Sequence, residues 1–181
     1  MNKKTLKEEK YEHITHPFPP LYDADSKILI LGSLPSVKSR EQMFFYGHPQ
    51  NRFWKVISAV LHENVPTTIE EKKTLLSAHH VALWDTIYSC DIIGSSDSSI
   101  KNVVPTDLRT VVEQSKIQHI YCNGRTSGEI SAENTGNDGG GAAFHKPCQC
   151  SIRTGEADCD LVGSIEGFTG MRGNVNRNIE I

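Results

Sequence analysis

The segment Lys27-Ile-Leu-Ile-Leu31-Gly-Ser-Leu-Pro-Ser36 decides how this chain is expected to fold. Residues 27–31 form a short apolar run, which is typical of a strand buried on both faces of a parallel sheet. Residues 32–36 are rich in the residue types that turn a chain. Because ligands collect at the carboxyl ends of strands in open α/β sheets, this loop is also the first place to look for chemistry. The alternative for the loop is an ordinary strand-exit turn.

The chain on either side of this segment alternates between helix-like and strand-like patterns up to about residue 130. Three segments are expected to be helices: 51–62, where apolar residues recur at helical spacing, 69–79 and 105–115. The last of these begins with a helix-start signal, with Thr106 or Asp107 in its first turn. Strand-like runs cover 80–84 and 117–122. This alternation predicts an α/β fold in which helices sandwich a parallel sheet.

A second stretch, Phe44-Phe-Tyr-Gly-His-Pro-Gln-Asn-Arg-Phe-Trp54, combines aromatic rings with amide groups. Aromatic faces beside amides suit a pocket that stacks a flat base and contacts its edge. The structural alternative is that the rings belong to the core and that Asn51 caps the helix that follows. For His48, the alternative to acid–base work is a plain surface position in a turn.

The length and composition favour one domain in a reducing compartment. A chain of 181 residues is short enough for a single core, and its net charge of −3 provides no overall positive field for nucleic acid. A small enzyme can still concentrate basic residues on one face. No apolar run is long enough to span a membrane, and Met1 to Lys10 does not resemble a secretory signal. The five cysteines are expected to be free thiols in a reducing cytoplasm. We also expect a monomer.

The order of these motifs resembles the hypoxanthine-DNA glycosylase (deoxyinosine glycosylase) branch of the uracil-DNA glycosylase superfamily. The similarity covers residues 14–127 and includes both stretches quoted above. The further segments that carry it are His16-Pro-Phe-Pro-Pro-Leu-Tyr22, Ala82-Leu-Trp-Asp85 to Ser89-Cys90, Gly94-Ser95 with Asp97-Ser98-Ser99-Ile100, and Ile120-Tyr-Cys-Asn-Gly124.

The resemblance implies a three-layer α/β/α sandwich around a four-stranded parallel sheet, with no metal and no cofactor. It implies removal of deaminated bases, hypoxanthine and also uracil, from DNA. In that role Asn51 positions the attacking water, and His48 is a candidate for acid or base assistance. Phe45 or Tyr46 stacks on the flipped base. The other candidate substrate-binding residues are Gly32, Ser33, Leu34, Pro35 and Ser36 at the sugar and phosphate, Asp85 at the base edge, and Asn123.

Hydrolysis of an N-glycosidic bond does not require these residues to act as covalent nucleophiles. The reaction passes through an oxocarbenium-like sugar, so the site needs an oriented water, donors to the departing base and tolerance of positive charge. No lysine lies within the motifs as a Schiff-base nucleophile, which predicts a monofunctional enzyme without a lyase step.

The sequence changes character after about residue 130, so we divide the chain into an α/β domain at 1–130 and a tail at 131–181. Nine of the 14 glycines lie in that tail, which shows no helical or strand period. The resemblance leads us to expect L-P-S-T-S-P-A-N and an amphipathic helix there. Back-translation of Gly139 to Ile165 with one base removed yields both. We therefore hypothesise a frameshift around Thr126 to Ile130, with the fourth strand and last helix missing or disordered.

Two other interpretations follow from this tail. A chain without the loop that wedges the duplex open is either a catalytically defective remnant or a DNA-binding module without catalysis. A zinc site in the tail is disfavoured, because the C-x-C spacing is unusual and an out-of-frame translation scatters Cys and His. The residues concerned are His145, Cys148, Cys150 and Cys159.

Overall fold

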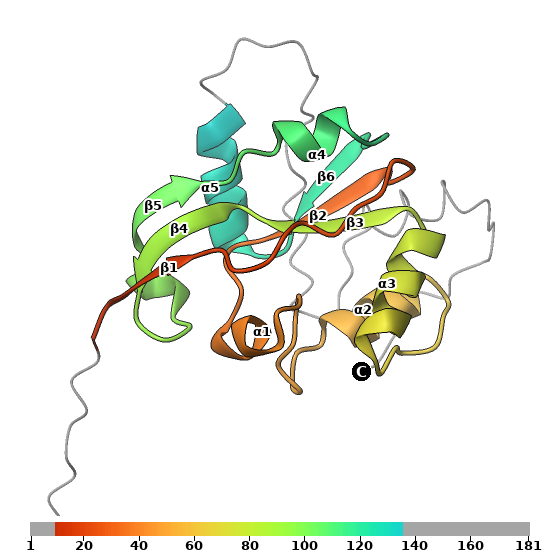
Figure 1. Ribbon diagram of the computed structural model, residues 1–181, viewed down its shortest axis with the longest axis horizontal. Helices are drawn as coiled ribbons and strands as arrows, with labels where there is room; N and C mark the ends of the chain where they lie inside the picture. Colours follow the sequence, from red (N-terminus) through yellow and green to blue (C-terminus); the bar gives the residue numbers. More distant parts are fainter. Residues whose placement is uncertain (1–9, 136–181) are drawn as a thin grey trace, which may run out of the picture.

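The computed structural model describes residues 10–135, which form two small sheets flanked by helices (Figure 1). In chain order the elements are β1 Glu12–Thr15, β2 Ile28–Gly32, α1 Val37–Gln42, α2 Phe53–Val60, α3 Ile69–Ala78, β3 Val81–Asp85, β4 Ile87–Ile92, the 3₁₀ turn η1 Asp97–Ser99, β5 Lys101–Pro105, α4 Arg109–Glu113, β6 His119–Cys122 and α5 Arg125–Thr135.

The apolar run at residues 27–31 forms most of β2, the central strand of a parallel sheet. The strand order is β3-β2-β6, and β2 pairs in parallel with both neighbours. Every residue of β2 is buried, because helices cover both faces of this sheet. The α/β class expected from the sequence is therefore confirmed.

A second, antiparallel sheet with the order β1-β4-β5 was not expected from the sequence. Only Thr86 separates β3 from β4, so the chain passes directly from one sheet into the other. The backbone N–H and the hydroxyl of Thr86 both donate to the carbonyl of Gly32, at 2.9 and 3.2 Å. The end of β2 is thereby fixed at the point where β4 turns away, which opens a space between the two sheets.

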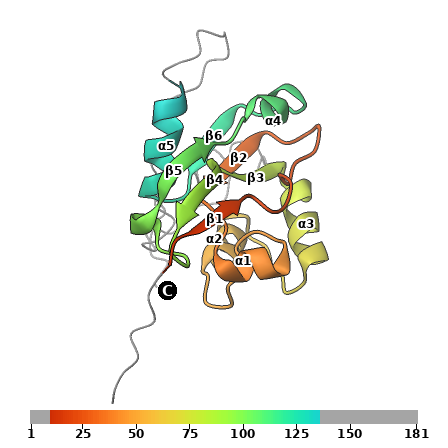
Figure 2. The ribbon, with the colours of Figure 1, turned by 60° about the vertical axis from the view of Figure 1, so that its left-hand side comes forward.

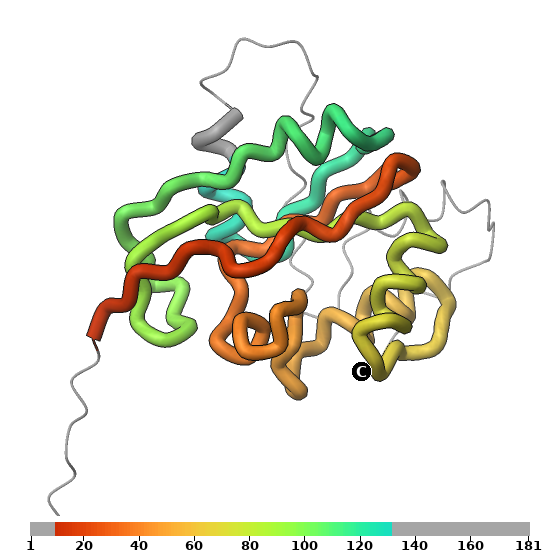
Figure 3. The backbone as a smooth tube through the Cα atoms, in the orientation of Figure 1, coloured from red at the N-terminus to blue at the C-terminus, as the bar shows by residue number. Residues whose placement is uncertain are grey.

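The helices form two outer layers around the sheets. In the two ribbon views α1, α2 and α3 lie on one side, and α4 and α5 lie on the other (Figures 1 and 2). The tube in Figure 3 follows β1 alongside β4 before the chain enters β2. The main core packs between these layers, and its fully buried members include Leu29, Leu31, Ile57, Leu76 and Leu83.

The start of α3 shows how local sequence fixes an element. Thr68 Oγ1 accepts from the N–H of Glu71 at 3.1 Å, and the Glu71 carboxylate accepts from the N–H of Thr68 at 3.2 Å. This reciprocal capping box satisfies two N–H groups that a helix start otherwise leaves unpaired. The carboxylate also accepts from the N–H of Thr67, and these bonds lower the pKa of Glu71.

Several expected boundaries were wrong. The helix expected over 105–115 is the shorter α4, because Pro105 ends β5 and pairs with β4 instead. Asp107 rather than Thr106 supports that helix start, since its carboxylate accepts from the N–H of Arg109 at 2.9 Å. The strand expected over 117–122 begins two residues later, at His119.

The helix α5 was not expected, and it runs across residue 130, where we divided the chain. The division into 1–130 and 131–181 stays a prediction. The proposed frameshift around Thr126 to Ile130 lies within α5 and stays a hypothesis. The back-translated segment from Gly139 to Ile165, where the expected loop and last helix would lie, and the four His and Cys positions of the tail lie outside the described residues.

Candidate active site at the carboxyl end of the parallel sheet

A cleft of about 950 Å³ opens where β2, β3 and β6 end. It collects all of the sequence-predicted site residues except His48: Gly32, Ser33, Leu34, Pro35, Ser36, Phe45, Tyr46, Asn51, Asp85 and Asn123. These residues come from four separate parts of the chain. Their convergence follows from the parallel sheet, which places the loops after its strands at one edge.

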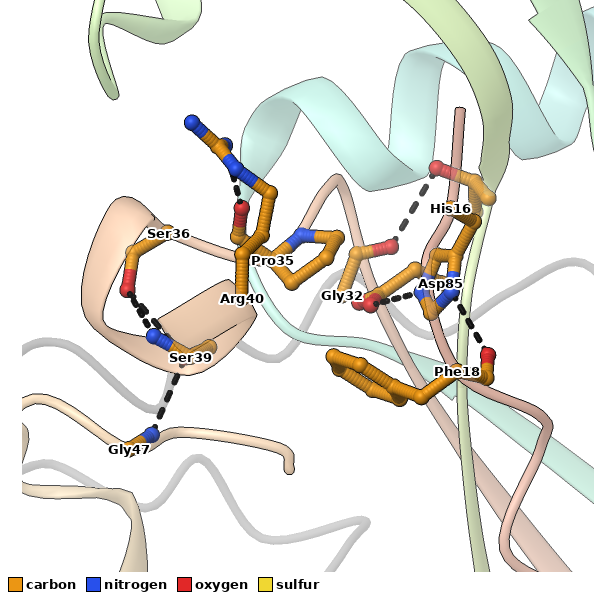
Figure 4. Close-up of polar contacts among 10 residues, drawn as sticks. His16, Phe18, Gly32, Pro35, Ser36, Ser39, Arg40, Gly47 and Asp85 are labelled. Atoms are coloured by element: carbon orange, nitrogen blue, oxygen red, sulfur yellow. Dashed lines mark hydrogen bonds and ion pairs between the residues drawn. The ribbon is translucent and has the colours of Figure 1, made fainter. Parts of the chain in front are cut away.

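The loop 32–36 is fixed at both ends by hydrogen bonds (Figure 4). Ser36 Oγ accepts from the N–H of Ser39 at 3.3 Å and caps α1. Arg40 Nη1 donates to the carbonyl of Pro35 at 2.9 Å. Ser39 Oγ also accepts from the N–H of Gly47 at 3.0 Å, which ties α1 to the aromatic stretch. The loop and the aromatic stretch are therefore held as one wall of the cleft.

Gly32 is required where β2 ends. A Cβ built on Gly32 would overlap Oδ1 of Asp85 and would lie 3.4 Å from the hydroxyl oxygen of Tyr46. The missing side chain thus allows the Asp85 carboxyl to lie against the backbone of β2.

The aromatic stretch divides its rings between core and cleft. Phe45 is 3% exposed and packs against Phe18 at 4.8 Å between centroids, so it is mainly a core residue. Tyr46 is half-buried and has a φ of 51°, a left-handed conformation that is rare for an aromatic residue. Its ring stacks on Phe53 with centroids 3.8 Å apart, and Asn123 Nδ2 donates to its hydroxyl at 3.1 Å.

The phenol of Tyr46 stays neutral in this setting. Burial of the hydroxyl and the nearby negative charge of Asp85 raise the pKa of Tyr46 far above its ordinary range, and the hydrogen bond from Asn123 offsets only part of this. Tyr46 therefore contributes a ring face and a neutral hydroxyl to the cleft.

Asn51 both supports α2 and lines the cleft. Its Oδ1 accepts from the N–H of Phe53, the first residue of α2, at 2.9 Å. Asn51 therefore stabilises the start of the helix, as the structural alternative predicted, and it also lines the cleft. A carbonyl oxygen has two lone pairs, so this contact leaves one for another donor. His48 does not line the cleft; it is exposed, and its Nδ1 accepts from the N–H of Gln50 at 3.1 Å. This geometry favours the turn interpretation of His48.

Sequence reasoning missed His16, which lies beside Asp85 (Figure 4). Asp85 ends β3, and its Oδ2 lies 2.8 Å from Nε2 of His16. The two side chains are 6% and 1% exposed, respectively, so this is a buried pair. Nδ1 of His16 lies 2.8 Å from the carbonyl of Phe18, and its ring centroid is 4.3 Å from that of Trp84. His16 belongs to the segment 16–22, which carries part of the family resemblance, but no local pattern in the sequence links this histidine to Asp85.

The opposite wall of the cleft was also missed, because it comes from the unexpected sheet and from α5. It comprises Ile92, Ser95, Asp97, Ser98, Ile100, Val103, Gly124, Arg125, Thr126, Glu129 and Ile130. Ser95 Oγ accepts from the N–H of Val37 at 3.0 Å, so this wall is bonded to the start of α1. Arg52 also lines the cleft, from the end of the aromatic stretch.

The fold and the cleft together define an α/β protein with a ligand site at the carboxyl edge of its parallel sheet. Within residues 10–135, no three His, Cys, Asp or Glu side chains are grouped so as to hold a metal ion. In the same range, no helix is long and apolar enough to cross a membrane.

Comparison with known proteins identifies the family. The model of the uracil DNA glycosylase superfamily matches residues 19–156, more than half of the chain. A hypoxanthine DNA glycosylase of Methanosarcina acetivorans is 36% identical over 118 residues, which are 64% of this chain and 75% of that protein. A hypoxanthine DNA glycosylase of Methanosarcina barkeri is 30% identical over 114 residues, covering 62% and 72%. The chain belongs to the uracil DNA glycosylase superfamily.

A solved structure agrees with this assignment. The solution NMR structure of a candidate uracil DNA glycosylase from Methanosarcina acetivorans is 32% identical and has a TM-score of 0.63. The similarity covers 74% of this chain and 81% of that one. The three-layer α/β fold is thus that of a DNA glycosylase superfamily.

Proposed function

We propose that this chain is a monofunctional DNA glycosylase that hydrolyses the N-glycosidic bond of hypoxanthine, and of uracil as a second base, in DNA. The observation that carries the proposal is the convergence of Asn51, Tyr46 and Asp85 on one cleft in a member of this superfamily. The names of the two relatives favour hypoxanthine as the preferred base.

The flipped base would lie between the aromatic stretch and the end of β3. Tyr46 is better placed than Phe45 to stack on it, because Phe45 is surrounded by core rings whereas Tyr46 is half-buried and rigidly held. Asp85 would contact the base edge through Oδ1. The loop 32–36 would hold the sugar and phosphate, since its bonds to Arg40 and Ser39 keep it in place.

Asn51 would orient the water that attacks the sugar. Its Oδ1 is fixed by the N–H of Phe53 and keeps a second lone pair for a water hydrogen. An amide is a poor base, but an oxocarbenium-like transition state needs a positioned water more than a strong base. No lysine lines the cleft within the described residues, which supports hydrolysis without a Schiff base. The proposal gives His48 no chemical role.

The proposed partner is DNA containing deaminated bases, bound by a cytoplasmic monomer. Arg52 and Arg125 line the cleft beside the acidic Asp85, Asp97 and Glu129. Arg125 Nε also donates to Glu129 at 2.9 Å, so any phosphate contact by these arginines would act in a chain whose net charge is −3. Binding through a few phosphate contacts weakens as salt rises.

The test uses the full chain and labelled duplexes that carry deoxyinosine or uracil, followed by alkali. Strand cleavage at the modified base is expected. Asn51→Ala should slow excision on the order of a hundredfold, whereas Asn64→Ala, at an exposed loop position outside the cleft, should not. Binding without cleavage would indicate a DNA-binding module, and neither binding nor cleavage would indicate a defective remnant.

A further inference from the structure

The hydrogen-bond partners of His16 fix where its protons lie. The carbonyl of Phe18, 2.8 Å from Nδ1, can only accept, so Nδ1 carries a proton and donates it. Nε2 lies 2.8 Å from Oδ2 of Asp85 in a site closed to solvent. Two lone pairs cannot form such a contact, so a second proton lies between Nε2 and Oδ2. Either a charged imidazole donates to a carboxylate, or a neutral imidazole accepts from a carboxylic acid.

Both arrangements leave Oδ1 of Asp85 without a proton. The only proton shared by the pair lies on the Oδ2 side of the carboxyl. Within residues 10–135, no hydrogen bond reaches Oδ1. This oxygen occupies the place where a side chain of residue 32 would be, beside the backbone of Gly32 in the lining of the cleft. Oδ1 is therefore a hydrogen-bond acceptor and never a donor.

We infer that His16 is a positioning residue that determines base specificity, by keeping Oδ1 of Asp85 an acceptor. This inference rests on the proposed function. Deamination turns the acceptor N1 of adenine into the N1–H donor of hypoxanthine, and the acceptor N3 of cytosine into the N3–H donor of uracil. An acceptor at Oδ1 binds both deaminated bases and repels the lone pair of both parent bases. Because the exocyclic amino groups of adenine and cytosine are donors, this distinction holds where Oδ1 faces the ring nitrogen of the base.

Removal of the His16 donor should reverse this selection. In His16→Leu the Asp85 carboxyl stays buried but loses the group that holds its proton on the Oδ2 side, so it takes up a proton of its own. A carboxylic acid can turn its O–H toward the cleft and donate to adenine. In His16→Gln the side-chain amide keeps a donor near Oδ2 without the ring charge. Tyr46 also lies near Asp85 and keeps a neutral hydroxyl, but within residues 10–135 the hydrogen bond found for that hydroxyl comes from Asn123 and none joins it to Asp85.

The test compares excision of deoxyinosine and deoxyadenosine by the full wild-type chain and the two variants. The preference for deoxyinosine should fall about tenfold or more in His16→Leu and should be largely retained in His16→Gln. A His16→Leu variant with the wild-type preference would overturn the inference.

Two further readouts separate the possible failures. A wild-type chain that removes no deoxyinosine counts against the proposed function, and this is seen before any His16 variant is made. If His16→Leu does not fold, as judged by its thermal transition, nitrogen-15 NMR of the wild-type histidines decides instead. The inference requires a proton held between Nε2 of His16 and Oδ2 of Asp85, so an Nε2 that carries no proton and makes no hydrogen bond refutes it.

Discussion

Replacement of Gly32 by alanine should destabilise the protein through Asp85. The new methyl group would overlap Oδ1 of Asp85 and lie 3.4 Å from its Cγ, so the carboxyl must move. The carboxyl is also held through Oδ2 by His16 at 2.8 Å, in a buried site. Displacement of the Asp85 carboxyl therefore strains or breaks its hydrogen bond with His16.

The magnitude follows from two opposing terms. Loss of a buried hydrogen bond of this kind costs about 1.5–3 kcal/mol. Alanine in place of glycine inside a strand recovers about 0.5–1 kcal/mol, because the unfolded chain loses freedom. The expected loss in the free energy of unfolding is therefore about 0.5–2.5 kcal/mol, measured by urea denaturation. Base excision should fall as well, since Oδ1 leaves its place.

A double-mutant cycle identifies the cause. In an Asp85→Ala background the methyl group at position 32 meets no carboxyl, so Gly32→Ala should cost nothing or stabilise the protein slightly. The coupling between the two substitutions should be about 1 kcal/mol or more. Additive effects within about 0.5 kcal/mol would refute the reasoning, because they would show that the methyl group acts on something other than Asp85.

Two further predictions concern stability. Thr68→Ala removes the capping-box acceptor of α3 and should lower the free energy of unfolding by about 1 kcal/mol, whereas Thr110→Ala, exposed within α4, should have a small effect on the melting temperature. The pKa of Tyr46 is raised in the folded state, so only the unfolded state ionises this phenol between its ordinary pKa of about 10 and the raised value. The free energy of unfolding should thus fall as the pH rises above about 10. This fall should be smaller in Tyr46→Phe, and an equal pH dependence in both proteins would contradict the burial of this hydroxyl.

Local patterns explain why much of the site was predictable. The loop 32–36 follows a buried strand directly, and Asp85 and Asn123 each stand at or just after the end of another strand. Parallel strands bring these ends together without any knowledge of side-chain packing. Asn51 and Tyr46 were predictable because rings and amides lie side by side in the sequence.

The missed parts depend on contacts between distant segments. His16 and Asp85 are 69 positions apart, and the sequence around each residue contains no pattern that predicts their contact. The strand β5 is exposed along its whole length, so it lacks the apolar alternation that identifies a half-buried strand. His48 was a candidate acid or base because it lies close to Asn51 in the sequence. The turn instead directs its Nδ1 to the N–H of Gln50 and away from the cleft.

The sequence by itself determined the α/β class, the superfamily and the loop in which chemistry is expected, because apolar runs and turn residues act over short stretches of chain. Only the tertiary structure decided how the stretch 32–36 is used. In the folded chain β4 turns away from β3 at Thr86, which opens the cleft. The fold also places the buried His16 against Asp85. These features arise from packing and hydrogen bonds between segments far apart in the chain, and no short pattern encodes them.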